Sequence, residues 1–282
     1  MVITPNCKIN FGLNVIRKRD DGFHDIESVF YPVGLSDTIE INPSADRQFR
    51  FSSSGLDIPG DPGSNLCVKA WELMKSLYHV PPVSIHLDKV IPPGSGLGGG
   101  SSDGAFTLKA LNEMFRLGLD TGQLKDLASR LGSDCTFFIE NVPAVAKGKG
   151  EILEKVSVNV GGLYLLIIVP PVHMDTSEAY SMIRPARHES PPEEIISLPV
   201  ERWRDQMTND FEVHVCNKYP AIRRIKEILY LNDAIYSSMS GSGSAVFGLF
   251  SQIPLLEGLF PGCFVWASSP LTLAPALTGY LR

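Results

Sequence analysis

The alternation of apolar and polar residues predicts strands, mostly in the first half of the chain. It is clearest in residues 7–15, where every second residue from Cys7 to Val15 is apolar and the residues between them are lysine, asparagine or glycine. A period of two is typical of a strand with one buried face. Similar reasoning predicts strands at 27–33, 37–41 and 83–90, and short apolar runs predict buried strands at 163–169 and 245–250.

Helical spacing of apolar residues predicts a second set of elements. In residues 65–77 and 121–131, leucine and alanine recur every three or four positions, and Gly132 follows the second segment as a helix end. Further helices are predicted at about 105–118, 201–216 and 219–231. Residues 184–200 are rich in proline and charge and predict a surface connection. We place a domain boundary near residues 155–162, which gives domains of residues 1–158 and 159–282.

A glycine-rich segment lies between the strand at 83–90 and the helix that follows it. Six glycines occur among the eleven residues from Gly94 to Gly104. Glycine lets the backbone approach a ligand closely, and successive N–H groups at the start of a helix attract an anion. Ser101 and Ser102 add hydroxyls, although they or Asp103 also suit helix caps. We interpret the segment as a phosphate-binding loop made of Pro92, Pro93, Gly94, Ser95, Gly96, Leu97, Gly98, Gly99, Gly100, Ser101 and Ser102.

Two familiar phosphate-binding motifs do not fit this loop. Gly94-x-Gly96-x-x-Gly99 matches the dinucleotide fingerprint in letters, but that motif needs a second strand after its helix, and here a second helix follows. The Walker A motif ends in Gly-Lys-Ser/Thr, whereas this loop ends in Gly100-Ser101-Ser102 and contains no lysine. Any cation that contacts the phosphates must therefore come from elsewhere in the fold.

Lys8 and Asp134 are the candidates for that cation and for an acid–base group. Lys8 lies on the polar face of the first strand, where a lysine is usually solvated. Asp134 lies between the helix end at Gly132 and two phenylalanines, where it is either a helix cap or a partly buried carboxylate. A buried carboxylate stays ionised only beside a cation or hydrogen-bond donors. An Asp–Lys pair would satisfy both groups and would suit the carboxylate to accept the proton of an attacking hydroxyl.

Two further segments are candidates for ligand contact. The turn Met239–Ser244 carries two glycines and suits either a close approach to a ligand or a plain strand-to-strand turn. Phe23 and His24 lie in a charged turn after the first strand. They suit either a stacking platform for a base or sugar, or local core packing.

Composition and charge narrow the class of protein. The chain has 282 residues, of which 44% are hydrophobic and 20% charged, as is usual for a soluble globular protein. The net charge of −6 argues against a general affinity for nucleic acid or an anionic membrane. No apolar run is long enough to span a bilayer, and the N-terminus lacks the features of a signal peptide, so we expect a cytoplasmic protein. The five widely spaced cysteines predict free thiols rather than disulfides or a dedicated metal site.

Together these segments resemble the GHMP kinase superfamily, which includes galactokinase and the homoserine, mevalonate and phosphomevalonate kinases. That superfamily has an N-terminal Lys/Asn strand, a Pro-x-Gly-x-Gly-Leu-Gly-Gly-Gly-Ser-Ser loop and a C-terminal glycine turn. The chain has all three in this order, as Lys8–Asn10, Pro92–Ser102 and Ser240–Ser244. The resemblance covers most of the chain and is strongest from residue 5 to about 153.

The chain resembles in particular those members that phosphorylate a CDP-linked methylerythritol in non-mevalonate isoprenoid synthesis. The segments that carry this likeness are Lys8-Ile9-Asn10, Arg19-Asp20-Asp21-Gly22-Phe23-His24, Asn65-Leu66 and Gly132-Ser133-Asp134. The resemblance implies an α+β GHMP kinase fold of two domains. These are an N-terminal domain on a mixed sheet with helices on one side and a C-terminal ferredoxin-like domain, with the active site between them.

The resemblance also implies roles for individual residues, with ATP and Mg²⁺ as co-substrate and cofactor. The ATP phosphates would lie on Pro92–Ser102 and the adenine near Asn65, Leu66 and Lys89. Asp134 would act as the base on the tertiary 2-hydroxyl of the substrate, with Lys8 beside it. The cytosine would stack between Phe23 and Tyr180 and would be recognised by hydrogen bonds around His24, and Asn10 would face the substrate. The implied partner is this small CDP-linked molecule, and the oligomeric state is left open.

The chain departs from the usual pattern at two places, and two alternatives remain. Phe23 stands where tyrosine is common, and Ser133-Asp134-Cys135-Thr136 replaces the more usual Ala-Asp-Val-Pro. Neither change removes a proposed catalytic group. One alternative is a homoserine or mevalonate type kinase, which has no need for the aromatic pair around Phe23. The other is a non-catalytic nucleotide-binding relative, against which the presence of both Lys8 and Asp134 speaks.

Overall fold

The computed structural model describes residues 1–271 except 173, 187, 255 and 257. By their internal contacts these residues form two compact units. The first unit consists of Met1–Lys8, Val33–Pro93 and Gly98–Asn141, and the remaining described residues form the second. The chain passes more than once from one unit to the other, so that strands β2 (Asn6–Lys18) and β3 (His24–Ser36) contribute residues to both.

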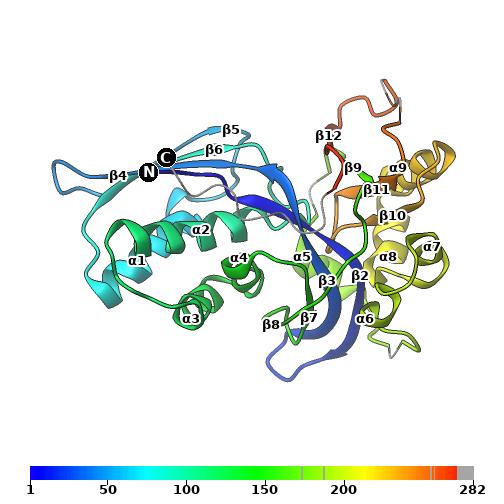
Figure 1. Ribbon diagram of the computed structural model, residues 1–282, viewed down its shortest axis with the longest axis horizontal. Helices are drawn as coiled ribbons and strands as arrows, with labels where there is room; N and C mark the ends of the chain where they lie inside the picture. The colour runs from blue at the N-terminus through cyan, green and yellow to red at the C-terminus, as the bar shows by residue number, and fades with distance from the viewer. Residues whose placement is uncertain (173, 187, 255, 257, 272–282) are drawn as a thin grey trace. The chain divides into compact units, whose positions relative to one another are not determined.

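The first unit is built on a four-stranded mixed sheet of order β1-β4-β6-β5. β5 runs parallel to β6, and the other neighbours are antiparallel. Helices α1 and α2 lie side by side on one side of this sheet (Figure 1). The elements are β1 (Val2–Ile3), β4 (Thr38–Pro43), β5 (Arg50–Gly55), β6 (Val83–Lys89), α1 (Leu66–Tyr78) and α2 (Gly99–Met114).

The local sequence explains these elements. β6 alternates buried Val83, Ile85 and Leu87 with polar residues on the opposite face. Asn65 begins α1, because its side-chain oxygen accepts the N–H of Cys67 at 2.9 Å. Helix α3 (Thr121–Leu131) begins with a capping box and is followed by a 3₁₀ helix (Ser133–Thr136) and by α4 (Phe137–Glu140).

The second unit contains an antiparallel sheet of order β10-β11-β9-β12. Apolar side chains of β9 and β11 pack with those of helices α8 and α9 in one core. A second sheet has the order β2-β3-β7-β8, with its last three strands antiparallel. The elements are β7 (Ala144–Lys147), β8 (Ile152–Lys155), β9 (Tyr164–Val169), β10 (Tyr236–Met239), β11 (Val246–Phe250), β12 (Phe264–Ala267), α5 (Thr176–Ser181), α6 (Pro192–Ile195), α7 (Trp203–Gln206), α8 (Asp210–Lys218) and α9 (Pro220–Leu231).

The α+β class is confirmed, but several details differ from the predictions. Helix α2 begins at Gly99 rather than near residue 105, so the second half of the glycine-rich loop is helical. The single helix predicted at 201–216 is two helices, because the chain is extended at Met207 and at Asn209, which caps α8. Residues 184–200 are not all surface, since Ile195 and Ile196 are buried. The domain limits of 1–158 and 159–282 stay a prediction.

In the described part of the chain, no helix is both long enough and apolar enough to cross a membrane.

Candidate active site

Lys8 and Asp134, which are 126 positions apart in the sequence, lie side by side in the first unit. The Lys8 Nζ atom is 3.5 Å from Oδ2 of Asp134. The side chain of Lys8 is 4% exposed and that of Asp134 is 31% exposed. The pairing that the sequence suggested is therefore present.

The position of Asp134 follows from how helix α3 ends. The helix stops at Leu131, and the N–H of Cys135 donates to the carbonyl oxygen of Gly132 at 3.2 Å. This turn continues into α4, whose Phe137 and Phe138 are buried. Asp134 is thus placed on a short turn between a helix end and a buried aromatic pair.

Gly98 brings the glycine-rich loop into contact with Lys8. Its φ of +71° is in the left-handed region that favours glycine. A Cβ atom at this position would lie 3.2 Å from Cε of Lys8 and 3.1 Å from Cζ of Phe138. A side chain at residue 98 would therefore crowd the stem of the lysine, so glycine suits this close approach.

The start of helix α2 is suited to an anion. Within the described residues no side chain caps this helix, because its N-cap residue is Gly98. The first intrahelical bond runs from the N–H of Ser102 to the carbonyl oxygen of Gly98 at 2.9 Å, so the N–H groups of residues 99–101 lack partners of this type. Their dipoles, with the ammonium of Lys8 beside Gly98, create a positive region where phosphate oxygens can bind.

The two loop serines differ in accessibility. Ser101 is half-buried, whereas Ser102 is fully buried and its Oγ has no hydrogen-bond partner among the described residues. Of the two hydroxyls, that of Ser101 is therefore the better placed to meet a ligand. A contact between the Ser102 side chain and ATP stays a prediction.

The residues predicted at the adenine occupy two different environments. Asn65 and Leu66 begin α1 where it packs on α2, since a Cβ at Gly104 would lie only 2.9 Å from Cβ of Leu66. Lys89 is instead 3% exposed, and its Nζ donates to carboxylates of Asp37 and Asp103. Its ammonium is thus engaged inside the first unit, and a position of Lys89 near the adenine stays a prediction.

The remaining part of the loop, Gly94–Leu97, belongs to the second unit and packs on the second glycine turn. A Cβ at Gly96 would lie 2.1 Å from the carbonyl oxygen of Ser240, and the Ser240 hydroxyl donates to the carbonyl oxygen of Gly96 at 2.9 Å. The N–H of Ala245 donates to the carbonyl oxygen of Ser95 at 2.9 Å. The turn Met239–Ser244, which was predicted to approach a ligand, therefore packs on the phosphate loop and stabilises it.

Asn209 holds this turn and is a residue that the sequence reasoning did not single out. Its Nδ2 donates to the carbonyl oxygens of Met239 and Gly241, both at 2.9 Å, and its Oδ1 accepts the N–H of Phe211. The available signal was an asparagine directly before an apolar helix, which indicates a helix cap but not this second contact.

Asn10 is buried in the second unit and contacts the same turn. Its Nδ2 donates to the Ser28 hydroxyl at 2.9 Å, and its Oδ1 accepts a long hydrogen bond from the Ser240 hydroxyl at 3.4 Å. Its side chain is therefore fixed by the protein, so that a role toward the substrate stays a prediction.

The aromatic residues predicted at the cytosine are arranged differently from a simple pair. His24 and Tyr180 stack on each other, with ring centroids 4.7 Å apart and an interplanar angle of 18°. Phe23 is 57% exposed, and the Nζ atom of Lys149 lies 4.8 Å from its ring centroid. The pKa of His24 is lowered by burial and by the nearby charge of Lys18, so its imidazole is neutral at pH 7. The contact of Lys149 with Phe23 was not predicted. The sequence feature that could have indicated it is the position of Lys149 between two glycines.

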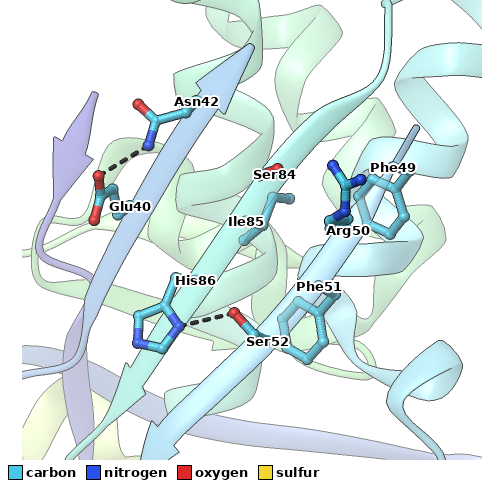
Figure 2. A pocket seen from close by; sticks show the side chains of 9 residues that line it. All are labelled: Glu40, Asn42, Phe49, Arg50, Phe51, Ser52, Ser84, Ile85 and His86. Atoms are coloured by element: carbon cyan, nitrogen blue, oxygen red, sulfur yellow. Dashed lines mark hydrogen bonds between the residues drawn. The ribbon is translucent and has the colours of Figure 1, made fainter. Parts of the chain in front are cut away.

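A shallow pocket of about 580 Å³ lies on the polar face of the first unit's sheet, over β4, β5 and β6 (Figure 2). Its polar groups largely satisfy one another. Glu40 accepts a hydrogen bond from Asn42, Arg50 pairs with Asp46, and the ring of His86 contacts the hydroxyls of two serines. None of the residues predicted at the active site lines it.

Comparison with known proteins places the chain in a family. The model of the GHMP kinases N terminal domain matches residues 65–149 and that of the GHMP kinases C terminal matches residues 195–254. The chain is similar to the 4-diphosphocytidyl-2-C-methyl-D-erythritol kinase of Parabacteroides distasonis, with 46% identity over 268 residues, or 94% of this chain and 98% of the relative.

Solved structures agree with this assignment. A crystal structure of 4-(cytidine 5'-diphospho)-2C-methyl-D-erythritol kinase aligns with a TM-score of 0.79 and 28% identity over 95% of this chain and 98% of that one. The homoserine kinase of Cytophaga hutchinsonii aligns with a TM-score of 0.68 and 17% identity over 94% of each chain, which concerns the fold alone. The GHMP kinase fold expected from the sequence is thereby confirmed. The chain belongs to the GHMP kinases and, among them, to the 4-diphosphocytidyl-2-C-methyl-D-erythritol kinase family.

Proposed function

We propose that this protein transfers the γ-phosphoryl group of ATP to the 2-hydroxyl of 4-diphosphocytidyl-2-C-methyl-D-erythritol, in the non-mevalonate isoprenoid pathway. The observation that carries the proposal is the Lys8–Asp134 pair in contact with the uncapped start of helix α2. The names of relatives that are 46% identical or more over most of their length support the choice of substrate.

In the proposed reaction Asp134 acts on the substrate hydroxyl. The hydroxyl oxygen attacks the γ-phosphorus, the bond to the β-phosphate oxygen breaks, ADP leaves, and the hydroxyl proton passes to the Asp134 carboxylate. The carboxylate is suited to this role because Lys8 pairs with it from the protein side while about a third of its surface stays accessible. Positioning and charge neutralisation are the main demands of phosphoryl transfer.

Lys8 and helix α2 supply the positive charge in this scheme. The N–H groups at the start of α2 bind phosphate oxygens, and the Lys8 ammonium offsets charge that develops on the transferring group. Lys8 thus has the role that the loop lysine has in Walker A proteins, but it lies on strand β2 and not in the loop itself.

The first unit can supply only a few of the ligands that Mg²⁺ needs. Across the described residues, no three His, Cys, Asp or Glu side chains gather in a group that could hold a metal ion. Mg²⁺ typically keeps several waters and binds through substrate phosphates with one or two carboxylates. We propose that Asp134 would be the carboxylate available to such an ion, which would take its other ligands from ATP oxygens and water.

The aromatic residues of the second unit are the proposed source of specificity for the cytidine group. The exposed Phe23 ring offers a stacking surface, and the neutral His24 imidazole can both donate and accept hydrogen bonds at a base edge. Tyr180 contributes through its stack on His24, which fixes the orientation of that imidazole. The free thiols of all five cysteines suit the reducing cytoplasm that we propose as the location.

Release of ADP by the purified protein tests the proposal. We expect ADP to form with Mg²⁺-ATP and 4-diphosphocytidyl-2-C-methyl-D-erythritol, and the organic product to carry one added phosphate. Turnover of homoserine or mevalonate in preference to this alcohol would indicate a sibling kinase. ATP binding without turnover of any of the three would indicate a non-catalytic relative.

A further inference from the structure

Three buried charged residues lie beneath the phosphate loop in the first unit and take no part in the proposed chemistry. Lys89 ends strand β6, and its Nζ donates to Oδ2 of Asp37 at 2.5 Å and to Oδ2 of Asp103 at 2.7 Å. All three side chains are 3% exposed or less. Burying one ammonium with two carboxylates is costly in free energy, so a fold that retains this cluster invites a functional explanation.

Asp37 fixes the entry to the phosphate loop. Its Oδ1 accepts the N–H groups of Val90 and Ile91, at 2.6 and 2.8 Å. These residues directly precede Pro92, where the loop begins. Asp37 therefore has two backbone N–H groups and the Lys89 ammonium as partners.

Asp103 lies at the other end of the loop, in the second turn of helix α2. Lys89 also reaches the first turn of this helix, since a Cβ at Gly99 would lie 3.0 Å from its Nζ and 2.8 Å from Cγ2 of Ile91. The lysine thus joins the strand that enters the loop to the helix that leaves it.

We propose that Lys89, held between Asp37 and Asp103, is a positioning residue that keeps the first-turn N–H groups of α2 in place for the ATP phosphates. This inference rests on the proposed function of the loop. The ammonium itself does not reach the nucleotide, because it is enclosed by its two carboxylates. Its loss would release the helix start from the strand and would weaken ATP binding more than binding of the second substrate.

The charge state of Asp103 gives a readout specific to this arrangement. Its Oδ1 has no hydrogen-bond partner among the described residues, and its pKa is raised to about 7, chiefly by burial and further by Asp37, while Lys89 opposes the shift. The thiols of Cys7 on β2 and Cys67 on α1 also face the cluster, but burial raises their pKa values well above neutral, so they stay uncharged. Above neutral pH, Asp103 therefore adds a negative charge beneath the phosphate site.

Calorimetric titration of the full-length protein with a non-hydrolysable Mg²⁺-ATP analogue tests the proposal. Lys89→Met should raise the Kd at least about tenfold, the effect of losing one good buried hydrogen bond or more. Asp103→Ala should do the same, whereas Asp103→Asn keeps an acceptor for Lys89 and should restore most of the affinity. Lys125→Met, which removes an ion pair with Glu140 elsewhere in this unit, serves as the control and should leave the Kd within about threefold.

Two further readouts separate positioning from general destabilisation. The KM for the alcohol substrate should change far less than the Kd for the nucleotide. Between pH 6 and 8 the wild-type Kd should rise more than the Kd of Asp103→Asn. In this variant residue 103 does not ionise, so only ionisation of the nucleotide itself changes the Kd. If Lys89→Met does not fold, the nucleotide Kd values of Asp103→Ala and Asp103→Asn test the inference.

Equal nucleotide affinity in wild type and Asp103→Ala would overturn the inference, as would a parallel loss of affinity for both substrates. Failure of the wild-type protein to bind the analogue would instead overturn the proposed function of the loop.

Discussion

The ammonium of Lys8 lies 3.5 Å from Oδ2 of Asp134, and the lysine is almost fully buried while nearly a third of the aspartate is exposed. The carboxylate thus has a fixed cationic partner within the protein and an accessible side for a ligand. A general base that takes a proton from a bound hydroxyl needs both properties.

Replacement of Asp134 by asparagine should remove turnover and spare nucleotide binding. The amide keeps the size of the side chain but cannot accept the hydroxyl proton, so kcat should fall by about 10²- to 10⁴-fold. Steady-state kinetics and calorimetric titration with an ATP analogue check the two parts separately. A variant that kept kcat within about tenfold of wild type would remove Asp134 from the role of general base.

Replacement of Gly98 by alanine should reduce catalysis through Lys8. The new methyl group would press on Cε of Lys8 and on the Phe138 ring, and the left-handed φ adds about 1–2 kcal/mol of backbone strain. Gly118→Ala is the matched control, because Gly118 has the same φ of +71° and an added methyl group there would meet nothing within 4 Å. Both variants share the backbone strain, so Gly118→Ala measures its cost in thermal unfolding. Gly98→Ala should lose further stability from the two close contacts, and it alone should lose kcat/KM. Equal activity of the two variants would contradict the contact that we describe.

Replacement of Gly96 by alanine should destabilise the contact between the phosphate loop and the second glycine turn. A Cβ there would lie 2.1 Å from the carbonyl oxygen of Ser240, which is backbone and cannot rotate away. Gly162→Ala has almost the same φ, +81° against +80°, and nothing within 4 Å. We expect Gly96→Ala to lower the Tm clearly more than Gly162→Ala. Indistinguishable Tm values would show that the two segments do not pack as described.

Acidification should weaken recognition of the alcohol substrate when His24 becomes charged. Burial and Lys18 lower the pKa of His24, so the imidazole stays neutral until the pH falls below its ordinary range. The KM for the substrate should therefore rise only in that acidic region. In Lys18→Met one of the two causes is absent, the pKa of His24 rises, and the increase in KM should begin at a higher pH. A KM profile that is the same in both proteins would exclude His24 as the titrating group.

The raised pKa of Asp103 also predicts how stability depends on pH. Between about pH 4 and pH 7 the folded protein holds a proton on Asp103 that the unfolded chain has lost, so rising pH lowers the free energy of unfolding. Asp103→Asn has no such group. Its stability relative to wild type should therefore increase from pH 4 to pH 7 and then level off, as measured by urea unfolding. A difference that stays constant across this range would show that Asp103 is ionised in the folded state.

Much of the first unit was predictable because its local signals agree with its tertiary structure. Helix α3 runs from Thr121 to Leu131 as its leucine spacing predicted, because Asp120 and Gln123 form a capping box and Gly132 follows its end. The pairing of Lys8 with Asp134 was one of two interpretations of the sequence, because a buried Asp134 needs a cation whereas a capping Asp134 and a solvated Lys8 do not, and the structure contains the pair.

Other features depend on contacts that the local sequence does not reveal. Helix α2 begins at two glycines, which are poor helix formers, because residue 99 packs closely against Ile91 and Lys89. Strand β5 is rich in serine and exists through its parallel pairing with β6. The role of Asp103 had one available signal, since it shares a buried helix face with Thr107 and Leu111. The stack of Tyr180 on His24 joins residues far apart in the chain, and only the family resemblance, which implies that both lie at the cytosine, pointed to it.

A competition experiment tests the central claim most directly. The purified protein is given limiting Mg²⁺-ATP with an equimolar mixture of 4-diphosphocytidyl-2-C-methyl-D-erythritol, homoserine and mevalonate, and the phosphorylated products are quantified by mass spectrometry. We predict that almost all of the transferred phosphate is found on the 2-hydroxyl of the CDP-linked alcohol. Phosphohomoserine or phosphomevalonate as the main product would contradict the substrate that we propose.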